Sequence, residues 1–265
     1  MPGEIVDVNG TQLYCEISGD DDLPVVVFVH GFSLDTRMWD GQVAAFSERY
    51  RVLRYDLRGF GRSAVPEANV PYQHQADLAA VLDHFGIAQA AIVGLSLGGA
   101  VALDFALNRP ERVRALVLAG SIVPGLATPD LAEISRAVWR SGKVGGADAA
   151  KALWIESPLF ETVHTRPSVS DAFRSMVTDY SGWGWTDADP GHWAEPDCNA
   201  QLGNITAPTL VVVGGFDLDG MQNNADALAA GIPGAELVVL PGLGHLPNME
   251  DAAAFNRVVL DFLDG

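Results

Sequence analysis

The chain has 265 residues, of which 48% are hydrophobic, and its formal net charge at pH 7 is −18. This length is enough to bury a large core and fits one α/β domain with an insertion. The negative charge argues against nucleic acid and anionic membranes as partners, because both carry negative charge themselves. No apolar run approaches the roughly 18 residues that a membrane-spanning helix needs.

The N-terminus and the two cysteines indicate where the protein works. The first residues contain no basic start followed by an apolar run, so no secretory leader is visible. Cys15 and Cys198 lie far apart, and a chain of this size does not depend on a disulfide. We therefore expect two free thiols and a cytoplasmic protein.

The first half of the chain alternates apolar strands with helical patterns, which predicts a parallel sheet with helices on both faces. Residues 5–17 alternate around Asn9-Gly10, which is typical of a two-residue hairpin. Residues 25–29 are all apolar and mostly β-branched, as in a strand covered on both faces. The other elements expected here are helices over 35–49 and 71–85, the second ended by Gly86, and strands over 50–56 and 113–120.

Between residues 122 and 203 this alternation stops. Pro and Gly interrupt the sequence, the helices look short, and aromatic residues gather. We interpret this segment as an insertion above the carboxyl edge of the sheet, where open α/β sheets place their sites. The alternation then resumes with strands over 208–215 and 236–240 and helices over 222–230 and 251–263. The predicted division is therefore a core of residues 1–121 and 204–265 and a helical cap of residues 122–203.

Large aromatic residues are the candidates for contact with a substrate. Most of those in the insertion should form its own small core, while a few should face the cleft, and we single out Trp139 and Trp185. Trp39 is a third candidate, although its spacing with Val43 and Phe46 fits the buried face of a helix. The Trp and Phe residues of the insertion are Trp139, Trp154, Phe160, Phe173, Trp183, Trp185 and Trp193.

The stretch 90–103 carries the strongest chemical signal. An apolar run passes through Gly94-Leu95-Ser96-Leu97-Gly98 into sequence suited to a helix that ends near residue 108. Glycine on both sides removes the Cβ atoms that would collide where a strand turns tightly into a helix. Such a turn lifts Ser96 clear of the sheet edge and above a helix N-terminus, where its hydroxyl becomes an exposed nucleophile.

Ser96, Asp217 and His245 each follow the end of an expected parallel strand, so they should meet at one edge of the sheet. In such a triad the imidazole takes the serine proton, and the carboxylate fixes the tautomer of the imidazole. Asp219 is a second candidate for the acid. Gly214-Gly215 indicates a turn that presents Asp217 first, which suits Asp219 to stabilising the turn.

Two backbone N–H groups should complete the site. Gly31 allows a sharp turn after the strand over 25–29, which points the N–H of Phe32 into the cleft. The N–H of Leu97, directly after the nucleophile, supplies the other half of an oxyanion hole. His30 ends the same strand, and we assign it a structural role because His245, in a Gly-rich loop, fits the base better.

The remaining histidines and charged residues show no spacing typical of a metal site. Asp56 and Arg58 should staple a tight loop rather than form an active-site ion pair. Phosphate-binding and cofactor motifs are also absent from the sequence, so we expect no metal and no cofactor. The histidines to which we assign packing or surface positions, or no role, are His74, His84, His164 and His192.

Taken together, these motifs resemble those of α/β-hydrolases that carry a helical cap. The segments that carry the resemblance are His30-Gly31-Phe32, residues 56–63, residues 94–98, Gly215-Phe216-Asp217 and Gly244-His245. The core is similar in style to 3-oxoadipate enol-lactonase-like members and related esterases. The resemblance implies the α/β-hydrolase fold and a serine hydrolase that cleaves a small-molecule ester or lactone through an acyl-enzyme.

Other activities on this fold stay open. Haloalkane dehalogenases and epoxide hydrolases resemble this core but carry Asp where this chain has Ser96. C–C bond hydrolases, cofactor-free perhydrolases and non-catalytic small-ligand-binding members share the fold, and the fold alone does not choose among them. The sequence also leaves open whether the protein is a monomer or a homodimer.

Overall fold

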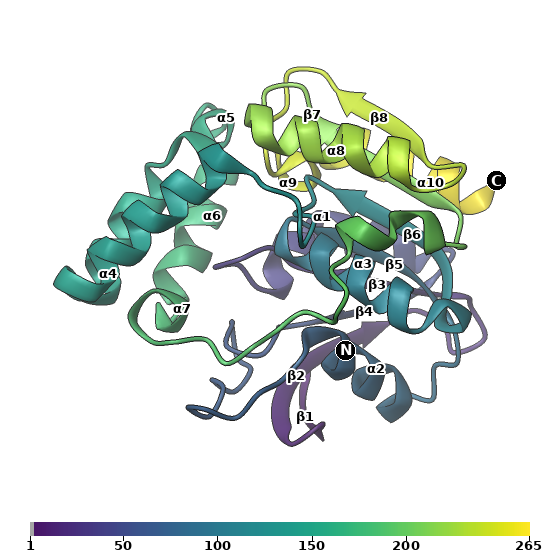
Figure 1. Cartoon of the computed structure of the whole chain (residues 1–265). Coiled ribbons are helices and arrows are strands. Elements are labelled where there is room, and N and C mark those ends of the chain that lie inside the picture. The colour runs from purple at the N-terminus through teal and green to yellow at the C-terminus, as the bar shows by residue number, and fades with distance from the viewer. Residues whose placement is uncertain (1–2) are drawn as a thin grey trace.

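A single eight-stranded sheet forms the centre of the computed structural model, which describes residues 3–265 (Figure 1). The strand order is β1-β2-β4-β3-β5-β6-β7-β8. The β1–β2 and β2–β4 pairs are antiparallel, and every other neighbouring pair is parallel. The strands are β1 (Glu4–Val8), β2 (Thr11–Ser18), β3 (Val25–Val29), β4 (Arg51–Tyr55), β5 (Ala90–Leu95), β6 (Val113–Ala119), β7 (Thr209–Gly214) and β8 (Glu236–Leu240).

Helices cover both faces of this sheet, as the alternating pattern predicts. In Figure 1, α2, α3 and α8 lie in front of the sheet, while α1 and α10 pack together behind it. The mostly parallel α/β architecture is thereby confirmed. The helices of the core are α1 (Asp40–Ser47), α2 (His74–His84), α3 (Leu97–Asn108), α8 (Asp219–Gly231), α9 (Pro247–Glu250) and α10 (Ala252–Asp264), with short 3₁₀ turns η1 (Thr36–Trp39) and η2 (Pro110–Arg112).

Several of the predicted helix boundaries are wrong in detail, and the helix expected from residue 71 begins at His74. The helix expected over 35–49 begins as the 3₁₀ turn η1, where the Asp35 side chain accepts the N–H of Arg37 and caps the turn. The helix expected from residue 222 begins at Asp219. The hairpin is as expected, because Asn9 and Gly10 both have positive φ, at 47° and 71°, as a tight primed turn requires.

The segment between β6 and β7 leaves the sheet, and α4 to α7 form a separate layer of helices on the left in Figure 1, before η4 returns to the core beside α8. The expectation of short helices is only partly right for α4, which spans 27 residues but consists of two helical segments joined by a kink at Gly146, whose φ of 78° is not helical. The division into a core of 1–121 and 204–265 and a cap of 122–203 stays a prediction. The elements of this segment are α4 (Pro129–Ile155), η3 (Pro158–Phe160), α5 (Glu161–His164), α6 (Pro167–Asp179), α7 (Trp183–Thr186) and η4 (Asn199–Asn204).

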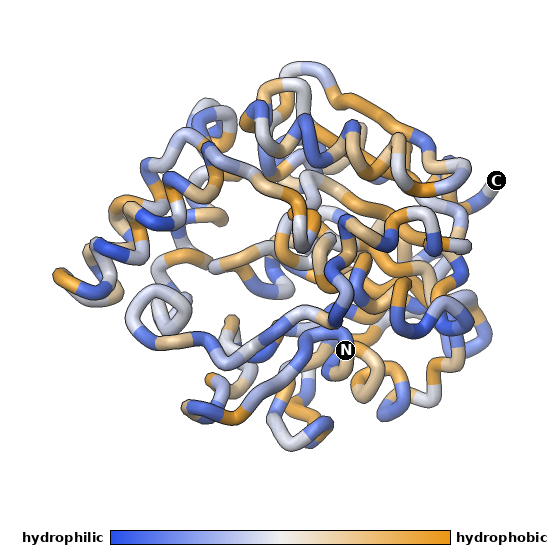
Figure 2. Tube along the Cα trace, in the orientation of Figure 1, coloured by the Kyte–Doolittle hydropathy of each residue, from blue (hydrophilic) through white to orange (hydrophobic). Residues whose placement is uncertain are grey.

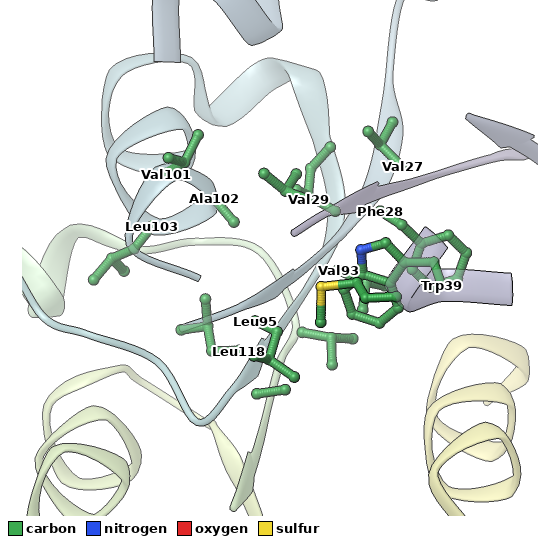
Figure 3. Packing of buried hydrophobic residues seen from close by; sticks show 14 of the residues in the cluster. Val27, Phe28, Val29, Trp39, Val93, Leu95, Val101, Ala102, Leu103 and Leu118 are labelled. Carbon is green, nitrogen blue, oxygen red and sulfur yellow. The ribbon is translucent and has the colours of Figure 1, made fainter. Parts of the chain in front are cut away.

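The hydrophobic core follows the central strands. Figure 2 shows apolar residues along the strands of the sheet and mixed polar and apolar residues along α4 and α6. All six residues of β5 are buried, so this strand is covered on both faces. Figure 3 shows Phe28 packed against Trp39 in this core.

Trp39 is a core residue, and the prediction that it contacts substrate is wrong. Its side chain has no exposed surface, and its ring lies 4.8 Å from that of Phe28 and 6.2 Å from that of Phe255. The η1 turn thus places it between Phe28 of β3 and Phe255 of α10. Its helical spacing therefore reflects burial.

Both cysteines are free thiols, as expected, and both are buried. Burial raises the pKa of Cys15 and of Cys198 to about 12, so neither is a ready nucleophile near neutral pH. Among residues 3–265 no helix combines the length and the apolar character needed to cross a membrane.

Candidate active site

Ser96 occupies a sharp turn between β5 and α3. Its φ of 55° and ψ of −114° lie outside the regions that residues with a Cβ normally adopt, which costs about 1–3 kcal/mol. The turn is possible because neighbouring positions are glycine: a Cβ on Gly94 would collide with the Gly98 carbonyl, and a Cβ on Gly98 with the Val29 carbonyl. The Ser96 N–H also donates to the Ala119 carbonyl at 2.9 Å, which ties the turn to β6.

His245 and Asp217 form a buried hydrogen-bonded pair at the same edge of the sheet. His245 Nδ1 lies 2.9 Å from Asp217 Oδ2, and both side chains are almost fully buried. Since an ionised carboxylate only accepts hydrogen bonds, Nδ1 carries the proton and Nε2 is left to accept one. The other carboxylate oxygen of Asp217 accepts the Leu218 N–H at 2.8 Å. Asp219 is exposed at the first residue of α8.

Ser96 and His245 line one cavity of about 400 Å³ between the sheet edge and the cap helices. The wall is mostly apolar, with Ser135 and Arg136 of α4 as its polar residues on the cap side. Residues that line it from the core include Phe32, Leu95, Ser96, Leu97, His245 and Leu246. Residues that line it from the cap include Leu131, Ser135, Arg136, Trp139, Phe160 and Trp185.

The two backbone groups expected to form an oxyanion hole belong to residues that line this cavity, Phe32 and Leu97. Leu97 is the first residue of α3, and the first N–H groups of a helix have no partner within it. In the described part of the chain, neither N–H takes part in a hydrogen bond of a turn or loop. Both are therefore free to donate to an oxygen in the cavity.

The wall next to Phe32 is held by a contact from the cap. Ser33 has a φ of 63°, and its hydroxyl accepts the indole N–H of Trp154 at 2.7 Å. The ring of Phe32 packs between Phe60 and Trp185, with ring centres 5.3 and 5.5 Å away. The position of the Phe32 N–H is thus fixed by residues from both layers.

These features agree with the comparisons with known proteins. A family model described as the alpha/beta hydrolase fold matches residues 24–252. The chain belongs to this family.

Among curated proteins, 3-oxoadipate enol-lactonase 2 of Acinetobacter baylyi is 29% identical to this hydrolase over 91% of this chain and 89% of its own. A putative carbamate hydrolase, RutD, of Variovorax paradoxus is 31% identical over 95% of this chain and 96% of its own. A solved structure of a thermophilic esterase from Thermogutta terrifontis, with malate bound, superposes with a TM-score of 0.84. It is 30% identical and the match covers 100% of this chain and 98% of the esterase. The expected likeness to enol-lactonases and esterases is confirmed.

His30 of this hydrolase has both ring nitrogens engaged in the core. Its Nε2 lies 2.8 Å from the Leu57 nitrogen and accepts that N–H, so Nδ1 carries the proton and donates to the Gly31 carbonyl at 2.8 Å. Complete burial lowers the pKa of His30, which keeps the ring neutral. Neither nitrogen is left to act as a base.

Asp56 and Arg58 hold the loop after β4 through separate partners. The Asp56 carboxylate accepts the N–H groups of Thr36 and Arg62, both at 2.8 Å. Arg58 pairs instead with buried Asp77 at 2.7 Å. Both residues therefore staple loops, as expected, but not to each other.

None of the remaining histidines lines the Ser96 cavity, although Phe32 and Leu97 separate it from a hollow that two of them line. Burial lowers the pKa of His74 to about 3, and His84 is exposed. His164 is held between the Ser170 hydroxyl and the Ile155 carbonyl inside the cap. His192 lines a separate hollow of about 110 Å³ together with His74. Residues 3–265 contain no cluster of three or more side chains suited to a metal ion.

Trp139 and Trp185 line the cavity of the hydrolase, whereas Trp39 does not. Our sequence reasoning missed Leu131, Ser135 and Arg136, which share the cavity wall with Trp139. Residues 131, 135 and 139 are four apart, so they lie along one face of α4. That spacing could have identified this face had the long helix been recognised.

Proposed function

We propose that this hydrolase cleaves a carboxylic ester or lactone through a covalent acyl-enzyme, with Ser96 as nucleophile, His245 as general base and Asp217 as the acid that orients it. One observation carries the proposal: the buried His245–Asp217 hydrogen bond and the strained Ser96 turn lie at the wall of the same cavity. Ser-His-Asp sets with this chain order and strand placement perform acyl transfer.

In the proposed mechanism the Ser96 hydroxyl oxygen attacks the carbonyl carbon of the substrate while its proton passes to His245 Nε2. The carbonyl oxygen becomes an oxyanion and accepts hydrogen bonds from the N–H groups of Phe32 and Leu97. The leaving oxygen takes the proton from His245 as its bond to carbon breaks. Water then attacks the carbonyl carbon of the acyl-enzyme while His245 Nε2 takes its proton. His245 passes that proton to the Ser96 oxygen as the acyl bond breaks, which releases the acid and restores Ser96.

The wall of the cavity supports a substrate with an apolar acyl group. Side chains such as Leu131, Trp139 and Phe160 remove apolar surface from water, whereas few polar groups are present to orient a strongly polar ligand. Arg136 is the one side chain with a permanent charge on this wall, among the described residues. Relatives named as an enol-lactonase and an esterase support an ester or lactone as the substrate.

A substrate screen tests the proposal. Purified protein is assayed on p-nitrophenyl esters of increasing acyl length and on simple lactones, with Ser96→Ala as the blank. We expect hydrolysis of esters or lactones that the Ser96→Ala variant does not catalyse. Faster cleavage of a vinylogous diketone than of any ester would instead favour a C–C bond hydrolase. Saturable binding of an ester without release of product would favour a ligand-binding protein.

A further inference from the structure

Glu250 of α9 holds the backbone on both sides of His245. Its carboxylate oxygens accept the N–H of Gly244 at 3.0 Å and the N–H of Leu246 at 3.1 Å. The Glu250 side chain is fully buried. A buried carboxylate that bridges these two N–H groups fixes the path of the loop, and hence the position of the His245 ring.

The same carboxylate is paired with a residue of the cap. Arg166, which immediately precedes α6, places Nη1 3.2 Å from Glu250 Oε2. Its Nη2 donates to the Gly242 carbonyl at 2.9 Å, and Nη1 also donates to the Thr162 carbonyl at 2.8 Å. The guanidinium therefore joins the loop that carries His245 to the segment that follows η3.

That segment also forms part of the cavity wall. Leu159 and Phe160 of η3 line the cavity, and the Phe160 ring centre lies 6.2 Å from that of His245. Thr162 packs so closely on Gly244 that any side chain at Gly244 would collide with it. The contact between this part of the cap and the His245 loop is therefore close-packed as well as charged.

We propose that Arg166 and Glu250 act as a positioning pair, through which the cap segment next to the substrate sets the geometry of the His245 loop. The inference rests on the proposed role of His245 as general base. Neither side chain touches the reacting atoms; each acts through the backbone of the loop. A displacement of about 1 Å at a catalytic group can cost 10²-fold in rate, so a loosened loop would lower kcat more than it would raise KM.

The two members of the pair have opposite electrostatic effects on the imidazole. Without the positive charge of Arg166, the negative charge of Glu250 is left unbalanced and favours protonated His245. Without the negative charge of Glu250, Arg166 disfavours that protonated form. The charged groups that face the His245 loop or its cavity from α4, the start of α6, the turn before α8, and α9 are Arg136, Arg166, Asp217 and Glu250.

The test compares Arg166→Gln and Glu250→Gln with matched changes in an exposed ion pair of the cap, Arg174→Gln and Glu156→Gln. The pH profile of kcat/KM is measured for each on one activated ester that the wild-type protein hydrolyses. We expect the acid limb to move to higher pH in Arg166→Gln and to lower pH in Glu250→Gln. Each shift should be about 0.5 pH unit, the order of magnitude expected when one nearby charge is removed from a partly screened site.

Both variants should also lose about tenfold to 100-fold in kcat with a smaller change in KM, whereas the two controls should stay near wild type. The double variant should lose less than the sum of the two single losses, because the partners act together. If Glu250→Gln fails to fold, the comparison of Arg166→Gln with Arg166→Lys tests the proposal. Lysine keeps the positive charge, so the acid limb of the kcat/KM profile should lie at its wild-type pH in Arg166→Lys and at higher pH in Arg166→Gln.

Shifts no larger than in the controls, or shifts in the same direction for both partners, would overturn the pair as a positioning device. Absence of ester hydrolysis by the wild-type protein is a different result. It would contradict the proposed function itself.

Discussion

At the scale of single residues, two neighbouring acids differ sharply in environment. Asp217 is buried against His245 Nδ1, whereas Asp219 is exposed at the start of α8. Asp217→Asn should lower turnover by about 10⁴-fold, because an amide no longer holds the imidazole in the productive tautomer. Asp219→Asn, the matched control, should cost far less. Both variants are measured on one activated ester, with the melting temperature as a check on folding; the opposite ranking would move the acid to Asp219.

Asp104 of α3 gives a pH-dependent prediction about stability. Its side chain is buried, and burial raises its pKa to about 6 from a usual value near 3.8. Because the pKa is raised in the folded state, the protonated carboxyl of Asp104 favours folding. Its contribution to the free energy of unfolding is complete below about pH 3.8 and is lost as the pH rises through about 6.

Asp104→Asn removes this titration while keeping nearly the same shape. The variant should match wild type at pH 4 and melt about 2–4 °C higher at pH 7.5, the rise that ~1 kcal/mol produces in a chain of this size. Thermal melts at several pH values check this, with exposed Asp148→Asn as the control. A variant that is less stable than wild type at pH 7.5 would show that the ionised carboxylate of Asp104 stabilises the fold.

At the scale of elements, α4 and α7 provide part of the cavity wall that we propose contacts the acyl group. Trp139 of α4 lines the cavity and is 49% exposed, so truncation should leave the fold intact. Trp139→Ala should shift the preference toward longer acyl chains by about tenfold in kcat/KM. This is roughly the effect of the free energy gained when two further methylene groups are buried. The ranking of ester chain lengths measures this.

Trp39→Phe is the matched control for Trp139→Ala, because Trp39 is buried beside Phe28 and lies outside the cavity. It should lower the melting temperature without changing the ranking of esters. A changed ranking in Trp39→Phe, or an unchanged one in Trp139→Ala, would contradict the assignment of the cavity wall.

The cap also shows where sequence patterns stop being informative. Gly145-Gly146 indicates the end of a helix, and α4 is indeed interrupted at Gly146, but the sequence does not indicate that a second helical segment follows directly. Trp39 and Trp139 both sit at helical spacing, and only the packing of their helices decides which one is buried. Local propensity therefore predicts that a helix exists more reliably than it predicts the neighbour of its apolar face.

At the scale of the whole molecule, the sheet was predictable because each parallel strand carries a strong local signal. The apolar runs of β3, β5 and β7 and the glycines around Ser96 specify buried strands and a tight turn with no reference to the rest of the chain. Parallel order then brings Ser96, Asp217 and His245 to one edge.

The contacts between the cap and the core were not predictable in this way. Trp154 donates a hydrogen bond to Ser33, 121 positions away in the sequence. Arg166 pairs with Glu250 at the His245 loop, which carries no periodic pattern in the sequence. Such pairs depend on how two layers meet, and a single sequence records no signal for that packing. They lie beside the Phe32 N–H and the His245 loop, so they bear directly on the site.

The central claim, that Ser96 attacks the substrate, is tested most directly by covalent labelling. The protein is treated with a fluorophosphonate, and the modified peptide is identified by mass spectrometry beside the Ser96→Ala variant. We predict that Ser96 is the one phosphonylated residue and that the Ser96→Ala variant takes no label. The turnover of this variant should be about 10⁶-fold lower than that of the wild type. A label on another serine, or a Ser96→Ala variant that still hydrolyses esters at the wild-type rate, would contradict the account.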